Sequence, residues 1–395
     1  GGFYSAEDAD SPRPDLPGES GEGAFYIWTK KEIDDALGAD APLFNECFGV
    51  EEGGNAPFDP QLEFTGRNIL YARFAPGERA AEFRLSAEEA VSRLERAKER
   101  LFALRSLRPR PLRDGKILTS WNGLMIGAFA RGGRILGDTR YRGAAVRAAG
   151  FITERLWKDG ILYRRYREGE SRFEAQLDDY AFLVAGLLDL FESSGEGRWL
   201  EHAVRLTERQ IAVFHDGGGR GFFETSGSDR SVLVRMKEQY DGEEPSGNSV
   251  TAMNLLRLSR MIDRPEWDAL GRETVANFGD MLQSRPSVIP LMAAALGLAL
   301  VPPRQVVVAG AGGDPRTVAL MDAVSRTYIP ETVLIPLDPG SNGDIPRSLN
   351  PFLRNLTPIG DAPAAYVCRN LVCDLPVSSA ESLANLLGAD GGGLQ

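Results

Sequence analysis

The sequence predicts a mainly α-helical protein built as an (α/α) six-hairpin toroid, a ring of helical hairpins that is incomplete at its amino-terminal end. Three observations lead to this prediction. Apolar helices alternate with one-sided amphipathic helices, short aromatic stretches separate the helical pairs, and a Pro-Pro step precedes a β-α-β pattern. We therefore expect a partial toroid over residues 1–301, a small α/β domain over 302–387 and a disordered Gly-rich tail over 388–395.

The helical hairpins recur at intervals of about 60 to 70 residues. The first helix of each pair is apolar nearly all round and must be buried, whereas the second has one charged face and lies at the surface. This alternation predicts an inner and an outer layer of helices. The expected pairs are 118–136 with 140–157, 179–191 with 198–214, and 249–262 with 266–282, and a further apolar helix is expected at 288–300.

Short strand-like stretches begin at Gly2, Gly160 and Gly221, and each leads through a polar turn toward the next inner helix. Aromatic residues bounded by glycine favour short β-hairpins between the repeats. Beyond the Pro-Pro step at residues 302–303, the pattern predicts a βα-β unit. The expected elements there are strands at 305–309 and 332–336, helices at 315–326 and from 379, and a hairpin at 365–375.

Composition argues against several kinds of partner. The net charge of −11 argues against nucleic acid and against an anionic membrane surface. No apolar run approaches the ~20 residues that a membrane span requires.

Three cysteines are too few for a disulfide scaffold, so we expect a cytoplasmic protein. The abrupt start at Gly1-Gly2-Phe3 suggests a truncated amino terminus.

Polar residues gather where the loops enter the expected inner helices. In a toroid these loops converge on one end of the central cavity. Carboxylates, amides and aromatic rings together suit a sugar, because rings stack on its C–H faces while polar groups bind its hydroxyls. We therefore expect a small carbohydrate-like ligand. The candidate catalytic residues are Asp178, Asp179 and Glu238, and the candidate substrate-binding residues are Asp8, Trp121, Asn122, Tyr180, Tyr240, Ser246 and Asn248.

The candidate aspartates also have a structural interpretation, because aspartate at a helix start accepts a backbone hydrogen bond and suits the helix dipole. Adjacent helical residues point about 100° apart. We therefore expect one of Asp178 and Asp179 to cap the helix and the other to face the cavity, with a pKa raised by burial. The cavity itself is expected to be one pocket lined by Trp121, Asp179, Tyr240 and Asn248.

The remaining candidates have alternatives of their own. Ser246 and Asn248 are capping residue types, and Trp121 suits a hydrophobic core. A solvated or salt-bridged role is the alternative for Glu238. The acidic segment that contains Asp8 suits either a hinge loop or a cation site.

No metal or cofactor is expected. The two histidines, His202 and His215, lie in positions that suit structural roles. Cys368 and Cys373 are too few for a four-ligand zinc site, so unlinked structural thiols are favoured over a metal half-site or a redox couple. The glycine-rich turn at 310–313 lacks dinucleotide-binding spacing, since the third glycine position falls on Pro315 and no acidic residue plainly ends the second strand.

Several stretches together resemble the family of spermatogenesis-associated, thioredoxin-domain-containing proteins. They follow one another in the order expected for that family and span nearly the whole chain. The stretches are GGFYSAEDAD at 1–10, GAFYIWT at 23–29, DGKILTSWNGLM at 114–125, LDDYAF at 177–182, YDGEEPSGN at 240–248 and YVCRN at 366–370.

The resemblance implies a six-hairpin toroid like those of certain glycosidases and sugar 2-epimerases, preceded by a divergent thioredoxin-like domain. This sequence departs from the family in lacking the thioredoxin part and the first hairpins. We therefore expect a carbohydrate-active toroid whose partner is the amino-terminal thioredoxin-like domain of the full-length protein. The alternative is a non-catalytic module that binds a ligand or client for that redox domain.

Overall fold

The computed structural model describes residues 1–13, 16, 18–56, 58–60, 62–218, 221–228, 232–340 and 344–388. The expected tail lies outside these residues from position 389 onward. The chain divides into two compact units, one of residues 6–115 and one of residues 1–5 with 116–395. This division differs from the predicted domains, because a boundary falls at residue 115 and the segment 302–387 shares a unit with the toroid helices.

The unit 6–115 is a small helical body with two short antiparallel strand pairs, β1 with β4 and β2 with β3. Capping boxes start two of its helices, Thr29 with Glu32 and Ser86 with Glu89, so side chains satisfy the free backbone N–H groups there. Its elements are β1 (Ala6–Glu7), β2 (Asp10–Pro12), β3 (Ser20–Glu22), α1 (Lys30–Leu37), α2 (Ala41–Phe48), α3 (Ala87–Arg105) and β4 (Arg113–Asp114).

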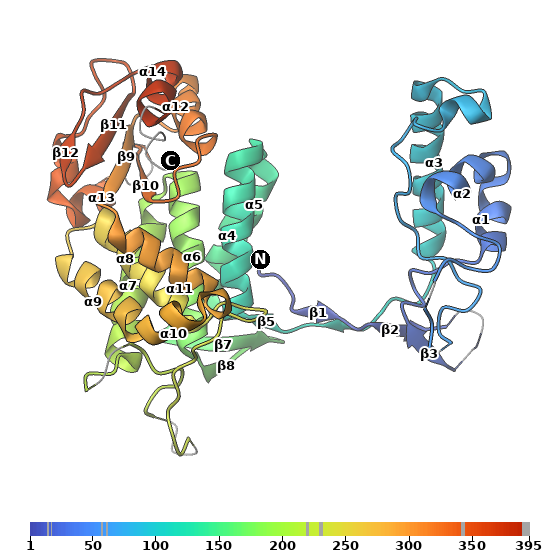
Figure 1. The fold of residues 1–395 in the computed structure, drawn as a ribbon, viewed down its shortest axis with the longest axis horizontal. Helices are drawn as coiled ribbons and strands as arrows, with labels where there is room; N and C mark the ends of the chain where they lie inside the picture. Colours follow the sequence, from blue (N-terminus) through green and yellow to red (C-terminus); the bar gives the residue numbers. More distant parts are fainter. Residues whose placement is uncertain are drawn as a thin grey trace. The chain divides into compact units, whose positions relative to one another are not determined.

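The second unit contains the predicted helical hairpins. Its helices are α4 (Thr119–Leu136), α5 (Thr139–Arg155), α6 (Leu177–Ser194), α7 (Gly197–Phe214), α8 (Gly247–Met261), α9 (Pro265–Asn277), α10 (Gly279–Ser284) and α11 (Pro290–Leu300). The inner helices α4, α6, α8 and α11 pack side by side in that order, and α5, α7 and α9 each pack on the inner helix that precedes them (Figure 1). This arrangement confirms the mainly α, incomplete toroid.

Two glycines, Gly123 and Gly186, let the backbones of α4 and α6 lie in close contact. A Cβ on Gly123 would lie 2.4 Å from the carbonyl carbon of Phe182, and a Cβ on Gly186 would lie 2.3 Å from the Gly123 oxygen. No larger residue fits at these positions without moving a helix backbone. The close approach holds the first turns of α4 and α6, where candidate residues lie, at a fixed separation.

A small antiparallel sheet lies at the entrances of the inner helices. Its strands are β5 (Ile117–Leu118), β6 (Trp157–Lys158), β7 (Ile161–Arg167) and β8 (Glu170–Glu174), with β7 paired to all three others. The stretch after Gly160 is therefore a strand, as predicted. The stretch at Gly221 forms a single antiparallel β-bridge, between Phe222 and His215, instead of a strand. In the stretches at Gly2 and Gly221, side-chain amides bind the backbones of Phe3 and Phe222.

The segment beyond residue 303 forms the predicted α/β part. Its sheet has the order β10-β9-β11-β12, with β9 and β10 parallel and β9 wholly buried. In Figure 1 this part lies at the end of α6 away from β7 and β8, and β10 contacts α6 and α8. The elements are β9 (Arg304–Ala309), α12 (Pro315–Ser325), β10 (Thr332–Leu337), α13 (Asp344–Leu349), β11 (Ala364–Arg369), β12 (Val372–Cys373) and α14 (Ala380–Gly388).

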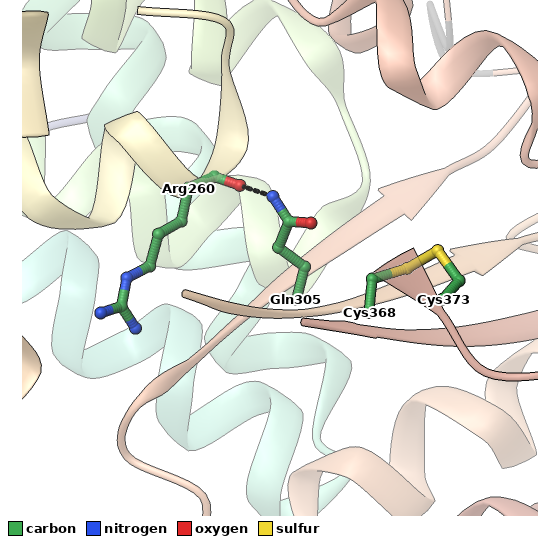
Figure 2. The surroundings of a disulfide bond; sticks show 4 residues. All are labelled: Arg260, Gln305, Cys368 and Cys373. Carbon is green, nitrogen blue, oxygen red and sulfur yellow. Dashed lines mark hydrogen bonds between the residues drawn. A yellow bond between two sulfur atoms is a disulfide. The ribbon is translucent and has the colours of Figure 1, made fainter. Parts of the chain in front are cut away.

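Cys368 and Cys373 form a disulfide bond, which corrects the expectation of unlinked thiols (Figure 2). The register of β11 and β12 places the two residues directly opposite each other, with their Cα atoms 3.9 Å apart. The sequence indicated a hairpin here but not which residues would face one another. Beside the bond, Gln305 of β9 donates its side-chain amide to the Arg260 carbonyl, which joins the sheet to α8.

Within the described ranges, no helix is both long and apolar enough to cross a membrane.

Candidate functional site

The entrances of the inner helices meet at one end of the helical layer. The Ser120 backbone N–H, in the first turn of α4, donates to Asp179 Oδ1 of α6 at 3.0 Å. The indole N–H of Trp121 donates to Glu244 Oε1, in the loop before α8. These contacts bring three segments of the chain together, although more than a hundred residues separate Trp121 from Glu244.

Asp179 is a buried capping residue. Its Oδ2 accepts the Gln176 N–H at 3.0 Å, closing a capping box at the start of α6, and its side chain is fully buried. Burial and the neighbouring Asp178 carboxylate raise the pKa of Asp179 to about 7, against the opposing effects of Arg164 and the backbone N–H groups of Gln176 and Ser120. Its oxygens are already bound by the protein, so Asp179 can order the entrance but has no free face for a ligand.

Asp178 is the partly exposed member of the pair. Arg164 of β7 lies against it, with Nη1 3.3 Å from Oδ1 and Nη2 3.4 Å from Oδ2. The same guanidinium reaches Asp179 Oδ2 at 3.2 Å and Gln176 Oε1 at 3.0 Å. One aspartate therefore caps the helix and the other is accessible. The pKa that burial raises is that of the capping carboxyl, Asp179, whereas a raised pKa was expected for the residue facing the cavity.

Glu224 is a carboxylate that the sequence analysis missed. Its carbonyl accepts the Leu177 N–H at 2.9 Å, so it lies over the start of α6. Its carboxyl is half-buried. Burial first, then the Glu238 and Asp178 carboxylates, raise the pKa of Glu224, while the Glu238 backbone N–H acts in the opposite direction. The Asp178 carboxylate, which pairs with Arg164, is thus one of the charges that act on Glu224.

Glu224 and Arg164 occupy equivalent places in successive repeats. Leu162 and Phe222 are the residues whose backbones the inner helices bind, through Tyr180 and Asn248. Arg164 and Glu224 each follow two residues later. The sequence alone does not show this equivalence, because the two residues lie at different distances from Gly160 and Gly221, the glycines that open the two stretches.

Three residues that were predicted to bind substrate form hydrogen bonds with backbone groups of the protein. Asn122 accepts the Phe3 N–H at 2.7 Å and donates to the Phe3 and Leu118 carbonyls. Asn248 binds the Phe222 N–H and carbonyl at 2.8 and 2.9 Å. The Tyr180 hydroxyl accepts the Leu162 N–H at 3.3 Å, and its ring is buried against Trp157 and Phe214. The three side chains bind the interrepeat stretches to the inner helices, so their polar atoms are already hydrogen-bonded within the protein.

Of the other predicted residues, one caps a helix and the rest have exposed or locally hydrogen-bonded side chains. Ser246 is the buried N-cap of α8, accepting the Ser249 N–H at 3.1 Å. Glu238 is exposed and its Oε1 accepts the N–H groups of Gln239 and Tyr240 at 2.9 and 3.0 Å. Tyr240 itself is exposed. Asp8 lies in the separate unit 6–115, where its Oδ1 accepts the Asp10 N–H at 3.1 Å.

A second missed residue, Asp241, positions the loop before α8. Its Oδ1 accepts the Ser246 N–H at 2.8 Å, and its Oδ2 accepts the Leu291 N–H at 2.9 Å. One carboxylate thereby binds the start of α8 and the start of α11. This contact fixes the loop that carries Glu238, Tyr240 and Glu244 relative to the inner helices.

A hollow of about 460 Å³ lies beside Arg164. Its polar and aromatic lining suits a hydrophilic ligand with a flat face. None of the four residues expected to share a pocket, Trp121, Asp179, Tyr240 and Asn248, lines this hollow. The lining residues are Arg164, Phe173, Glu174, Ala175, Gln176, Thr225, Ser226, Ser228 and Val232.

Among the residues that the structure describes, no three His, Cys, Asp or Glu side chains lie together in a way that could hold a metal ion. The side chains gathered at the inner-helix entrances include carboxylates, Arg164 and aromatic rings.

Comparison of the sequence with curated proteins finds close relatives. The chain is 37% identical over 410 aligned positions to spermatogenesis-associated protein 20 of Homo sapiens, and 35% identical over 410 positions to the protein of that name in Mus musculus. Each alignment covers 98% of this chain and 52% of the relative. The chain thus spans about half the length of the curated relatives it matches. No protein-family model matches the sequence.

Solved structures were compared with the fold as well. A cellobiose 2-epimerase from Bacillus thermoamylovorans B4167 is 14% identical with a TM-score of 0.40, covering 53% of this chain and 60% of that one. A sugar epimerase from a ruminal bacterium is 10% identical with a TM-score of 0.37, covering 64% of this chain and 72% of that one.

Proposed function

This chain is homologous to spermatogenesis-associated protein 20, and we propose that its toroid acts on a sugar-like ligand bound at the entrances of the inner helices. The observation that carries the proposal is the half-buried carboxyl of Glu224, whose pKa is raised and which interacts with the Asp178 carboxylate. A raised pKa keeps a carboxyl protonated closer to neutral pH, where it can serve as a general acid.

Glu224 and Asp178 have complementary environments. Glu224 is the candidate acid, which gives its proton to the leaving oxygen of a glycosidic bond. Asp178, held in place by Arg164, is the candidate base, which takes a proton from the water that attacks the anomeric carbon. Glycoside hydrolysis commonly uses such a pair of carboxyl groups in different environments.

The surroundings suit a carbohydrate. Glu224 and Asp178 do not line the hollow of about 460 Å³ themselves, but Thr225, next to Glu224 in the chain, and Arg164, which pairs with Asp178, both do. The hollow offers the hydroxyls of Ser226 and Ser228, the amide of Gln176 and the exposed ring of Phe173. Exposed rings of Trp121 and Tyr240 lie on the adjoining segments. Aromatic faces stack on the C–H faces of sugars while hydroxyls, amides and charged groups bind sugar hydroxyls.

A panel of aryl glycosides and oligosaccharides, incubated with the purified chain, tests the proposal. We expect turnover of at least one member, with a loss of more than a hundredfold in Glu224→Gln and Asp178→Asn. Glu243→Gln is the matched control, since Glu243 is an exposed carboxylate on the same loop that carries Glu244. Turnover that survives both substitutions contradicts the assignment of the pair.

The second candidate function is binding without chemistry. It is favoured by one observation, namely that the polar residues on the inner helices themselves, Asp179, Asn122 and Asn248, are all bound to backbone groups. In that case the loops alone recognise a sugar or a client of an attached thioredoxin-like domain. Glycan binding that is unchanged in Glu224→Gln, with no turnover in either protein, would favour this second candidate.

A further inference from the structure

A second cavity, of about 340 Å³, lies between the α/β part and the toroid helices. Gly137 and Gly195, which end α4 and α6, line it, so it lies at the opposite ends of these helices from the Glu224 and Asp178 pair. The full lining is Gly133, Arg134, Gly137, Thr139, Arg142, Ser193, Ser194, Gly195, Val308, Gly310, Gly312, Thr317, Val318, Met321, Asp322, Pro336 and Asp338.

The cavity adjoins the carboxyl ends of two parallel strands. Val308 near the end of β9 and Pro336 near the end of β10 both line it, and the chain between them turns through Gly310 into α12. In open α/β sheets, ligands bind in the crevice outside the carboxyl ends of the strands. The helix α12 begins at the same edge, where Pro315 has no N–H and the Asp314 side chain accepts the Arg316 N–H.

Two buried hydroxyl groups in the cavity lining find no hydrogen-bond partner in the part of the chain that the structure describes. Thr317 of α12 is 5% exposed and Ser193 of α6 is 9% exposed, and the structure gives neither Oγ1 of Thr317 nor Oγ of Ser193 a bond. Leaving a buried polar group unpaired costs about 1–3 kcal/mol. Each of the two oxygens is closed to water here, so a ligand that forms hydrogen bonds would satisfy both after a small movement of the cavity lining.

The glycine-rich turn packs directly against the unpartnered Thr317. A Cβ on Gly310 would lie 2.4 Å from Thr317 Oγ1 and 2.6 Å from Pro363 Cβ, so only glycine fits there. The turn therefore leaves backbone, and no side chain, between the strand and the first turn of α12. This is the close backbone approach that phosphate-binding turns require.

An acidic residue ends the second strand, contrary to the sequence analysis. The strand β10 runs one residue further than predicted, to Leu337, and Asp338 follows it immediately. Asp338 Oδ2 accepts the Gly312 N–H at 2.9 Å and Oδ1 accepts the Gly340 N–H at 2.8 Å. Its carboxylate is thereby held at the cavity, where a carboxylate at the end of a second strand can bind ligand hydroxyls.

Positive charge comes from the toroid side. Arg142 of α5 makes no ion pair or hydrogen bond among the residues that the structure describes. Arg134 of α4 pairs with Glu192 at 3.3 Å through Nη1, but its buried Nε has no partner. Guanidinium groups with free N–H donors bind phosphate oxygens strongly, often through two bonds.

We propose that this cavity binds a small phosphorylated, hydroxyl-bearing metabolite, of the chemistry shared by a nucleoside monophosphate and a sugar phosphate. Arg142 and Arg134 bind the phosphate. The Asp338 carboxylate accepts hydrogen bonds from ligand hydroxyls, and Thr317 and Ser193 gain the partners that they lack. The site is separate from that of the proposed function and does not depend on it.

Calorimetric titration of the chain with three probes, AMP, glucose 6-phosphate and inorganic phosphate, tests the site. We expect at least one of the two organic phosphates to bind more tightly than inorganic phosphate, because only they offer hydroxyls to Asp338. AMP binding alone would identify a nucleotide site, and glucose 6-phosphate binding alone a sugar phosphate site. Each of these two results supports the proposal. No heat from any probe, or equal affinity for all three, overturns it.

Substitutions then separate binding from folding. Arg142→Gln is expected to weaken the organic phosphate at least tenfold, whereas Arg140→Gln, on the same helix but paired with Asp138 outside the cavity, should leave binding unchanged. Thr317→Val is expected to weaken binding while leaving the thermal midpoint of the free protein equal or higher, because it removes an unpaired hydroxyl. Unchanged affinity in both Arg142→Gln and Thr317→Val overturns the assignment.

Discussion

Ser120 and Asp179 join the first turns of α4 and α6, through a hydrogen bond of 3.0 Å from the Ser120 N–H to Asp179 Oδ1. The carboxyl that makes this bond is fully buried, and its pKa is raised to about 7. The bond and the close contact at Gly123 together fix the geometry of the inner-helix entrances.

The buried carboxyl of Asp179 predicts a dependence of stability on pH. Its pKa in the folded protein, about 7, exceeds the ordinary value of about 3.9 in an unfolded chain. The folded state therefore holds the proton more tightly, so this group stabilises the fold fully below about pH 4 and the contribution is lost as pH rises to about 7. The loss is at most about 4 kcal/mol.

Urea unfolding of the wild type and of Asp179→Asn across that pH range measures the effect. The free energy of unfolding of the wild type should fall relative to that of the variant between about pH 4 and 7. The difference should then stay level at higher pH. A constant difference at every pH contradicts a raised pKa.

Substitution of Asn248, which was predicted from the sequence to bind a ligand, should lower the stability of the fold. Asn248→Ala leaves the buried Phe222 N–H and carbonyl without their side-chain partner, which should cost about 1–3 kcal/mol of unfolding free energy. Gln283→Ala, on an exposed face of α10, is the control and should change stability by less than about 0.5 kcal/mol. Equal midpoints for the two variants would show that the Asn248 amide does not hold the backbone.

The disulfide predicts the number of reactive thiols. In denaturant without a reductant, a thiol reagent should label one cysteine, Cys47, and after reduction it should label all three. The bond closes a short loop, so its removal in Cys373→Ser should lower stability by only about 2 kcal/mol. Three reactive thiols before reduction would mean that Cys368 and Cys373 are unlinked in solution.

Substitution of Asp241 should loosen the starts of α8 and α11 and should not unfold the whole protein. Asp241→Ala removes the acceptor of the Leu291 N–H at the start of α11 and of the Ser246 N–H before α8. We expect a loss of about 1–2 kcal/mol and faster hydrogen exchange at Leu291 and Ser246. Asp280→Ala, an exposed aspartate in the first turn of α10, should leave both amides unchanged. Slow exchange at Leu291 in Asp241→Ala would refute this role.

The helical layers could be predicted from the sequence because the apolar pattern alone decides which helices are buried. The all-round apolar pattern after Leu177 became the nearly wholly buried α6. The pairing of Cys368 with Cys373 could not be predicted, since it depends on the register of a short hairpin. Asp338 was missed for a similar reason, because the end of β10 differs by a single residue from the predicted end.

The candidate site was harder to predict than the fold. Polar residues at helix starts serve both as caps and as ligand contacts, and sequence does not distinguish the two uses. Asp179 and Asn248 proved to bind backbone groups, which appears only when their partners, distant in sequence, are in place. Glu224 was missed because it lies in an interrepeat stretch and not at a helix start.

Glu224 and Asp178 are proposed to act on a sugar bound at the inner-helix entrances. A glycan array probed side by side with the wild type and Glu224→Gln tests this role, because a variant without its acid should retain a substrate that it cannot convert. We expect Glu224→Gln to stay bound to one class of glycan and the wild type to convert the same glycan in solution. Retention of no glycan by either protein would mean that the two carboxyl groups do not act on a sugar.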